Sequence, residues 1–132
     1  DSGSTGGSSA YAATGRTVDI PDFGLRAALE DTLGKQAGGP ITDTQLARLT
    51  ELHAPESSIT DLTGLEHCTG LTRLNLTNNQ ISDITAVANL TELTRLSLDS
   101  NEISDITAVA NLTNLTWLNL GGNQISDISA LT

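Results

Sequence analysis

The chain has 132 residues, of which 37% are hydrophobic and only 2% aromatic, so its core must be built from aliphatic side chains. Its formal net charge is −10, from 16 acidic and 6 basic residues. Such a surface repels phosphate groups, which excludes nucleic acid and anionic membrane surfaces as expected partners. The sequence also contains no apolar run of the roughly 18 residues that a membrane-spanning helix needs.

The first segment, residues 1–16, is rich in Gly and Ser and almost uncharged. This composition is typical of a flexible linker or tail. The alternative is an ordered tail, which would need a surface to lie against.

Residues 17–48 are predicted to form an N-terminal helical cap. The segment 17–20 alternates polar and apolar residues, as a short half-buried strand does. Asp22 is a natural N-cap for a helix that ends at Gly34. Thr42 to Gln45 has the spacing of a capping box, which predicts a second short helix. The first helix should bury one face, formed by Leu25, Ala28, Leu29 and Leu33.

From Leu49 onward the sequence repeats every 22 residues, and the period predicts a stack of structural units. Each unit has the form LxxLxLxxNxIxxIxxVxxL. Residues 74–76 alternate with the period of a strand, whereas the spacing of three after Ile81 favours a tight, 3-10-like path. The units are 49–70, 71–92, 93–114 and the partial unit 115–132.

One unit cannot close a core, because its apolar positions all point to the same side. Stacked units share a continuous core and contribute one strand each to a parallel sheet. The predicted fold class is therefore an α/β solenoid with an N-terminal helical cap.

Two polar columns recur at the same spacing. The asparagines are expected to bond backbone groups at the bend after each strand, at a cost of about 1–3 kcal/mol for each group left unpaired; they are Asn79, Asn101 and Asn123. The aspartates follow Ser or Thr and precede a helical turn, so capping is favoured over calcium binding, which needs several ligands within one segment; they are Asp61, Asp83, Asp105 and Asp127.

The strings NQISDIT, NEISDIT and NQISDIS resemble the 22-residue repeats of the bacterial internalin-type leucine-rich-repeat family. The resemblance covers residues 49–132, and the segments PDFGLRAALEDTLGK and PITDTQLARLTEL are similar to the N-terminal caps of bacterial surface repeat proteins. It implies a right-handed coil with the parallel sheet on its concave face. It also implies export to the bacterial surface, where the sheet would bind a macromolecule, and it is compatible with a lipid anchor upstream. The chain departs from the family in being short and in lacking a C-terminal cap.

The inventory of chemically reactive side chains is small. His53, His67 and Cys68 have no spacing that resembles a metal site, and Cys68 occupies a core position of the repeat. The sequence therefore predicts neither an enzyme nor a cofactor.

The outward strand positions should form three columns: Glu51, Arg73, Arg95 and Trp117; His53, Asn75, Ser97 and Asn119; and Pro55, Thr77, Asp99 and Gly121. An exposed Trp beside Arg is typical of protein-binding hot spots, and Trp also stacks on sugar rings. The alternative is that Arg95 merely stacks on Trp117. The predicted binding residues for a protein or glycan are Arg73, Arg95, Trp117, Asn75, Asn119, His53 and Asp99.

A second hypothesis is self-assembly. The strand at 118–120 should have an unpaired edge, and such edges invite pairing with another chain. One explanation of the open end is that the chain is a fragment of a longer repeat array. In the other two, the Gly/Ser tail of a neighbour covers the end, or N-terminal caps stack on C-terminal edges, and copies join head-to-tail into an extracellular fibre.

Overall fold

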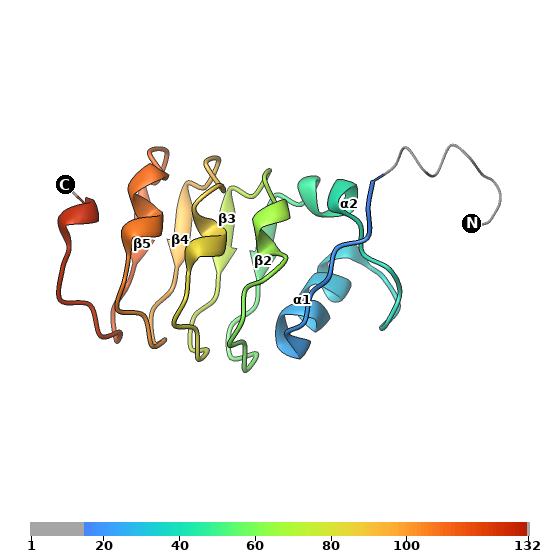
Figure 1. The fold of residues 1–132 in the computed structure, drawn as a ribbon, viewed down its shortest axis with the longest axis horizontal. Coiled ribbons are helices and arrows are strands. Elements are labelled where there is room, and N and C mark those ends of the chain that lie inside the picture. Colours follow the sequence, from blue (N-terminus) through green and yellow to red (C-terminus); the bar gives the residue numbers. More distant parts are fainter. Residues whose placement is uncertain (1–14, 132) are drawn as a thin grey trace.

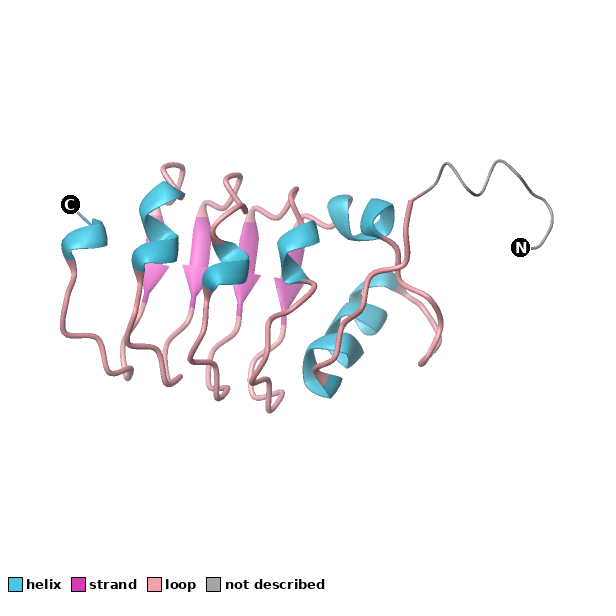
Figure 2. Cartoon of the chain, viewed as in Figure 1, coloured by secondary structure: helices cyan, strands magenta, loops and turns pink. Residues whose placement is uncertain are grey.

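The protein is a solenoid in which a parallel sheet and a row of short helices form opposite sides of the coil (Figures 1 and 2). The structure, a computed structural model, describes residues 15–131. The strands are β2 (Glu51–His53), β3 (Arg73–Asn75), β4 (Arg95–Ser97) and β5 (Trp117–Asn119). The 3-10 helices are η2 (Leu65–His67), η3 (Thr85–Val87), η4 (Thr107–Asn111) and η5 (Ser129–Leu131). The predicted solenoid with its parallel sheet is confirmed, whereas most of the predicted tail at 1–16 lies outside the described residues.

The strands pair in sequence order, β2-β3-β4-β5, and every pair is parallel and offset by one repeat. Leu52 lies opposite Leu74, Leu74 opposite Leu96, and Leu96 opposite Leu118. The first three of these side chains are buried and Leu118 is half-buried. The 22-residue period therefore places equivalent side chains directly above one another.

The other apolar repeat positions form parallel columns in the same core, and Cys68 is one of their members, with no exposed surface. In the second unit, for example, Leu76, Ile81 and Leu90 are fully buried.

No helix in the described range 15–131 has the length and apolar character needed to cross a membrane.

Helices α1 (Phe23–Leu33) and α2 (Asp43–Ala47) close the end of the stack beside β2 (Figure 1). α1 begins after the N-cap Asp22 and ends at Gly34, whose φ of 69° is left-handed and favours glycine. α2 has the predicted capping box, because the backbone N–H of Gln45 donates to Thr42 and the N–H of Thr42 donates to the Gln45 side chain. The cap buries one face of α1 through Leu25 and Leu29.

The strand predicted over 17–20 is wrong in extent. Only Thr17 pairs, antiparallel with Thr42, next to a hydrogen bond from Val18 N–H to the Ile41 carbonyl of 2.8 Å. Val18 and Ile20 are buried, which accounts for the alternating pattern. They pack into the cap without a neighbouring strand that could extend the ladder.

The buried carboxylate of Asp22 joins the cap to the first repeat. Its Oδ1 accepts the Leu25 N–H at 2.9 Å, and its Oδ2 accepts the N–H groups of Thr60 at 2.8 Å and Asp61 at 3.0 Å. Burial raises the pKa of Asp22, but these hydrogen bonds and one from the Thr60 hydroxyl together outweigh it, so the pKa lies below its usual value.

We expect Asp22→Asn to destabilise the protein at pH 7, because an amide has a single acceptor oxygen and turns N–H donors toward N–H donors. A carboxyl whose pKa is lowered by folding stabilises the protein above its unfolded pKa, and this contribution is lost as the pH falls through the folded value. The difference from wild type should therefore shrink below about pH 4. Urea unfolding at pH 7 and pH 3 measures it, with the exposed Asp19→Asn as a control. A difference that is independent of pH would contradict the ionic role of Asp22.

Candidate binding surface

The exposed side of the sheet carries the side chains that the sequence predicted to face solvent. The register of the strands aligns them in columns. Arg73 on β3 lies opposite Glu51 on β2 and Arg95 on β4, and Arg95 lies opposite Trp117 on β5. They surround a shallow hollow of about 230 Å³. We call this surface the sheet face; its residues are Glu51, His53, Arg73, Asn75, Arg95, Ser97, Trp117 and Asn119.

Trp117 is 42% exposed and also stacked against an arginine. The guanidinium carbon of Arg95 lies 5.1 Å from the centroid of the indole ring, within cation–π range. The exposed tryptophan and the Arg95 contact, which the sequence posed as alternatives, are both present. Stacking occupies one face of the ring, and the rest of the side chain remains accessible.

In the second column the asparagine side chains are anchored by their oxygens. Asn75 Oδ1 accepts the Thr77 N–H at 3.0 Å, and Asn119 Oδ1 accepts the Gly121 N–H at 3.0 Å. The amide nitrogen of Asn75 donates to His53 Nδ1 at 3.1 Å. The asparagines therefore offer solvent few acceptors.

Asp99 lies one step further along, at the bend after β4. It accepts a hydrogen bond of 2.9 Å from the hydroxyl of Thr77, its neighbour one repeat earlier. This residue is half-buried and bonded to the third column, and it is not among the residues that line the hollow of the sheet face.

The asparagine column lies inside the bend after the strands. Asn101 Nδ2 donates to the carbonyls of Leu76, Leu98 and Asp99, and its Oδ1 accepts the Ile81 N–H. Asn79 and Asn123 make the same kind of contacts, each linking its own unit to the one before. Each amide thus joins two consecutive units.

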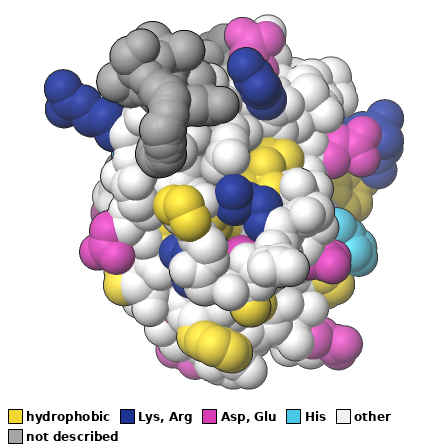
Figure 3. Space-filling model, turned by 90° about the vertical axis from the view of Figure 1, so that its right-hand side faces the viewer, with side chains coloured by type: hydrophobic (Ala, Val, Ile, Leu, Met, Phe, Trp, Pro, Cys, Tyr) yellow, Lys and Arg dark blue, Asp and Glu magenta, His cyan; other side chains and the backbone are white. Residues whose placement is uncertain are grey.

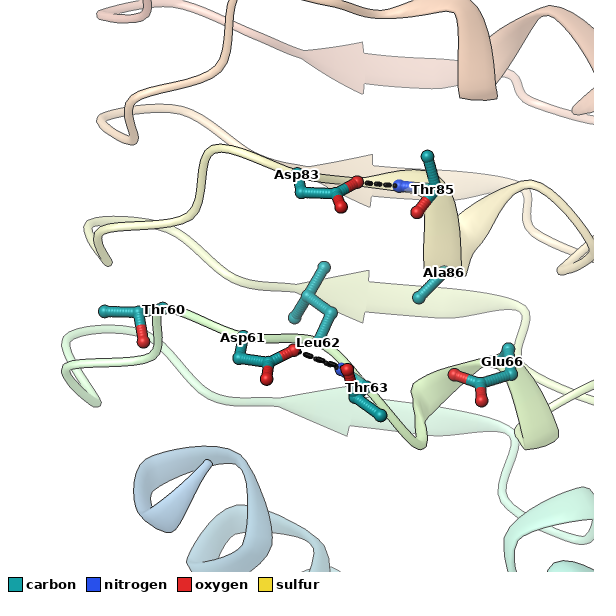
Figure 4. Close-up of a pocket in the computed structure, with 8 residues that line it drawn as sticks. All are labelled: Thr60, Asp61, Leu62, Thr63, Glu66, Asp83, Thr85 and Ala86. Atoms are coloured by element: carbon teal, nitrogen blue, oxygen red, sulfur yellow. Dashed lines mark hydrogen bonds between the residues drawn. The ribbon is translucent and has the colours of Figure 1, made fainter. Parts of the chain in front are cut away.

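The aspartate column lies on the opposite side of the coil, beside the 3-10 helices (Figure 4). Asp83 Oδ1 accepts the Thr85 N–H at 2.9 Å, and Asp61 accepts both the N–H and the hydroxyl of Thr63. Asp105 and Asp127 accept equivalent backbone bonds. Because the helix N-cap is Ile84, one residue after Asp83, these bonds form Asx turns that lead into the helices rather than strict N-caps.

The hydrogen bond from the Thr85 N–H is the main cause that lowers the pKa of Asp83, and the equivalent backbone bonds do the same for Asp105 and Asp127. Across residues 15–131, no group of three His, Cys, Asp or Glu side chains is placed so that it could hold a metal ion.

Cys68 is a poor nucleophile. Burial, followed by the charge of Glu66, raises the pKa of its thiol to about 12, so the thiol is protonated at neutral pH. His67 is partly exposed, and its Nε2 lies 3.7 Å from Oε2 of Glu66.

Two further columns follow the repeat and were not identified from the sequence. Thr72, Thr94 and Thr116 each donate a hydroxyl hydrogen bond of 3.1 Å to the carbonyl of the threonine one repeat earlier. Their common 22-residue spacing was the signal that could have revealed them. A second column has left-handed backbone at the bend that follows each strand, at Glu56, Asn78, Ser100 and Gly122.

The two ends of the coil differ. Ile128 and Leu131 are 61% and 48% exposed at one end, beside half-buried Leu118 and Leu120. The other end, formed by the cap, carries acidic and basic side chains interspersed with hydrophobic and polar ones (Figure 3).

Two family models match the chain. A model described as leucine rich repeat matches residues 69–125, and one described as two copies of leucine rich repeats matches residues 47–89. A comparison with curated protein sequences found no match.

Solved structures give a closer comparison. The internalin InlF of Listeria monocytogenes is 38% identical, with a TM-score of 0.81 over 85% of this chain and 33% of its own. The functional domain of InlJ from the same species, described as including a cysteine ladder, is 37% identical, with a TM-score of 0.80 over 89% of this chain and 27% of its own. A leucine-rich-repeat protein of Leptospira interrogans is 28% identical, with a TM-score of 0.59 over 62% of this chain and 22% of its own. The chain thus spans a third or less of the two internalin structures that it matches.

Proposed function

Because the chain belongs to the leucine-rich-repeat family and has the internalin-like form of its fold, we propose that it is the non-catalytic interaction module of an exported bacterial surface protein. In this proposal the sheet face binds a protein or glycan partner. The likeness to the internalins InlF and InlJ supports export, which the sequence resemblance to this family implies.

The observation that carries the proposal is the exposed Trp117 stacked against Arg95 at the β5 edge of the polar sheet face. Trp and Arg are enriched among the residues that dominate binding energy in protein interfaces. The Arg95 contact also holds the indole in one orientation before a partner arrives, which reduces the ordering cost of binding.

The test is to pan a random peptide library on the immobilised protein and to probe a glycan array with the labelled protein. Trp117→Ala should reduce binding by roughly thirtyfold or more, the range of a hot spot. Its melting temperature should stay within a few degrees of wild type, because the side chain is far from fully buried. Circular dichroism checks the fold.

Phe23→Ala is the matched control, because Phe23 is an 87% exposed aromatic outside the sheet face. It should leave binding unchanged. If Trp117→Ala instead collapses the melting temperature, Trp117 is a core residue and the proposed hot spot is wrong.

Head-to-tail assembly is the alternative. Exposed Ile128 and Leu131 provide an apolar surface that a second copy could cover, and a further repeat would cover it equally well. Light scattering over a range of protein concentrations separates the two functions. Polymers that form without ligand would replace the receptor proposal, and a strict monomer would end the assembly hypothesis.

A further inference from the structure

The basic residues of the repeat region lie together at one site. Residues 49–132 contain ten acidic residues and two basic ones, Arg73 and Arg95. These two arginines are register partners on adjacent strands, so both lie on the sheet face. Of the remaining four basic residues, three belong to the cap and Arg16 precedes it. An otherwise acidic solenoid thus presents one positively charged pair.

The pair has no acidic partner within the described chain. Within residues 15–131, Arg26 forms an ion pair with Glu30, and Glu66 lies 3.7 Å from His67, a pair that is ionic only if the imidazole is protonated; neither Arg73 nor Arg95 lies within ion-pair distance of an acidic side chain. Glu51 is the register partner of Arg73, but their charged groups are not in ion-pair contact. The N–H groups of both guanidinium forks therefore remain available to an external acceptor.

The asparagines around the pair offer mainly donors, and Glu51 is the one carboxylate of the sheet face. The oxygens of Asn75 and Asn119 already accept backbone N–H groups, and Asn119 Nδ2 has no acceptor among the described residues. Neutral sugars require acceptors as well as donors for their hydroxyl groups. A carboxylate only accepts hydrogen bonds, and it matches the planar fork of arginine.

The stacking geometry favours the same ligand. With Arg95 over the indole, one face of Trp117 is closed to a sugar ring. A guanidinium that stacks on its flat side keeps its N–H edge free to donate in its own plane. We therefore infer that the sheet face recognises an acidic peptide segment of a protein partner, with an Asp or Glu carboxylate held between Arg73 and Arg95 and an adjoining side chain against Trp117.

This inference rests on the proposed function and narrows it to one partner class. The experiment pans a phage-displayed random peptide library on the wild-type protein. The best peptide is then synthesised, together with a copy in which Asn and Gln replace Asp and Glu. Both are titrated by the fluorescence of Trp117, the single tryptophan of the chain.

Recovered peptides should be enriched in Asp and Glu, and the neutral copy should bind much more weakly. Arg73→Gln and Arg95→Gln should each reduce affinity roughly tenfold to hundredfold, the range for a hydrogen bond to a charged group. Arg73→Lys should lose part of the affinity, because it retains the charge but not the fork. Glu51→Gln should tighten binding, and the exposed cap variant Arg48→Gln should leave it unchanged.

Recovered peptides without acidic enrichment, or full binding by Arg73→Gln, would overturn the inference; the proposed function would stand if Trp117→Ala still abolished binding. Recovery of no peptide, together with Arg73-dependent binding of glycans bearing uronic or sialic acid, would replace the peptide by an acidic glycan. If neither library bound wild type better than Trp117→Ala, the inference and the proposed function would both fail.

Discussion

Replacing Leu96 by alanine is expected to lower the free energy of unfolding by about 2–5 kcal/mol, the range for a fully buried leucine. Leu96 has no exposed surface and lies on β4, between Leu74 and Leu118 of the adjacent strands. Its removal leaves a cavity that both neighbouring units line. Total stabilities of domains are only about 5–15 kcal/mol, so the loss is large. Urea unfolding followed by circular dichroism measures it.

Leu118→Ala is the matched control, because Leu118 occupies the same repeat position but is half-buried. Less apolar area is lost there and solvent can enter the space, so we expect a smaller decrease. An equal or larger decrease for Leu118→Ala would show that burial does not set the cost along this column.

Asn101→Ala is expected to destabilise the protein by about 2–3 kcal/mol, because it leaves several buried backbone groups without partners. Asn101 is 4% exposed, accepts the Ile81 N–H at 3.1 Å and donates to the Leu76 and Leu98 carbonyls at 3.0 Å. These groups belong to two units, so the substitution weakens the contact between them. Equilibrium unfolding in urea gives the difference from wild type.

The control for Asn101 is Asn111→Ala, an exposed asparagine at the end of η4. Its replacement should change stability by less than about 0.5 kcal/mol. Asn101→Asp should also destabilise, because it keeps an acceptor but loses both amide donors and buries a charge. Equal stability of the Asn101→Ala and Asn111→Ala variants would contradict the structural role of the column.

The repeat period was sufficient to predict the solenoid and the sheet register, because residues 22 apart must stack once the units do. The predicted alignment of Arg73, Arg95 and Trp117 is found on β3, β4 and β5. The bounds of α1 could also be predicted, since Asp22 and Gly34 are local signals.

Contacts between distant segments, side-chain torsions and the exact type of each turn could not be predicted from the repeat period or from local sequence signals. The Asp22 carboxylate was predicted to cap α1, but its second oxygen binds Thr60, 38 residues away, and no local pattern marks that contact. The orientation of Arg95 over Trp117 depends on side-chain torsions that repeat spacing does not specify. The aspartates were predicted as caps, yet the distinction between an N-cap and an Asx turn needs the backbone position of Ile84. Which part of the sheet face contacts a partner stays a prediction.

The uniform register has a consequence for how such proteins can diversify. Since each strand pairs with the next at the same offset, duplication of the 93–114 segment in the gene would add one strand, about 4.8 Å of width, and the pairings on both sides of it would keep the same register. It would also place a third guanidinium in line with the first two. The width of the sheet and its local charge could thus grow one unit at a time, while every strand kept a neighbour of the same register.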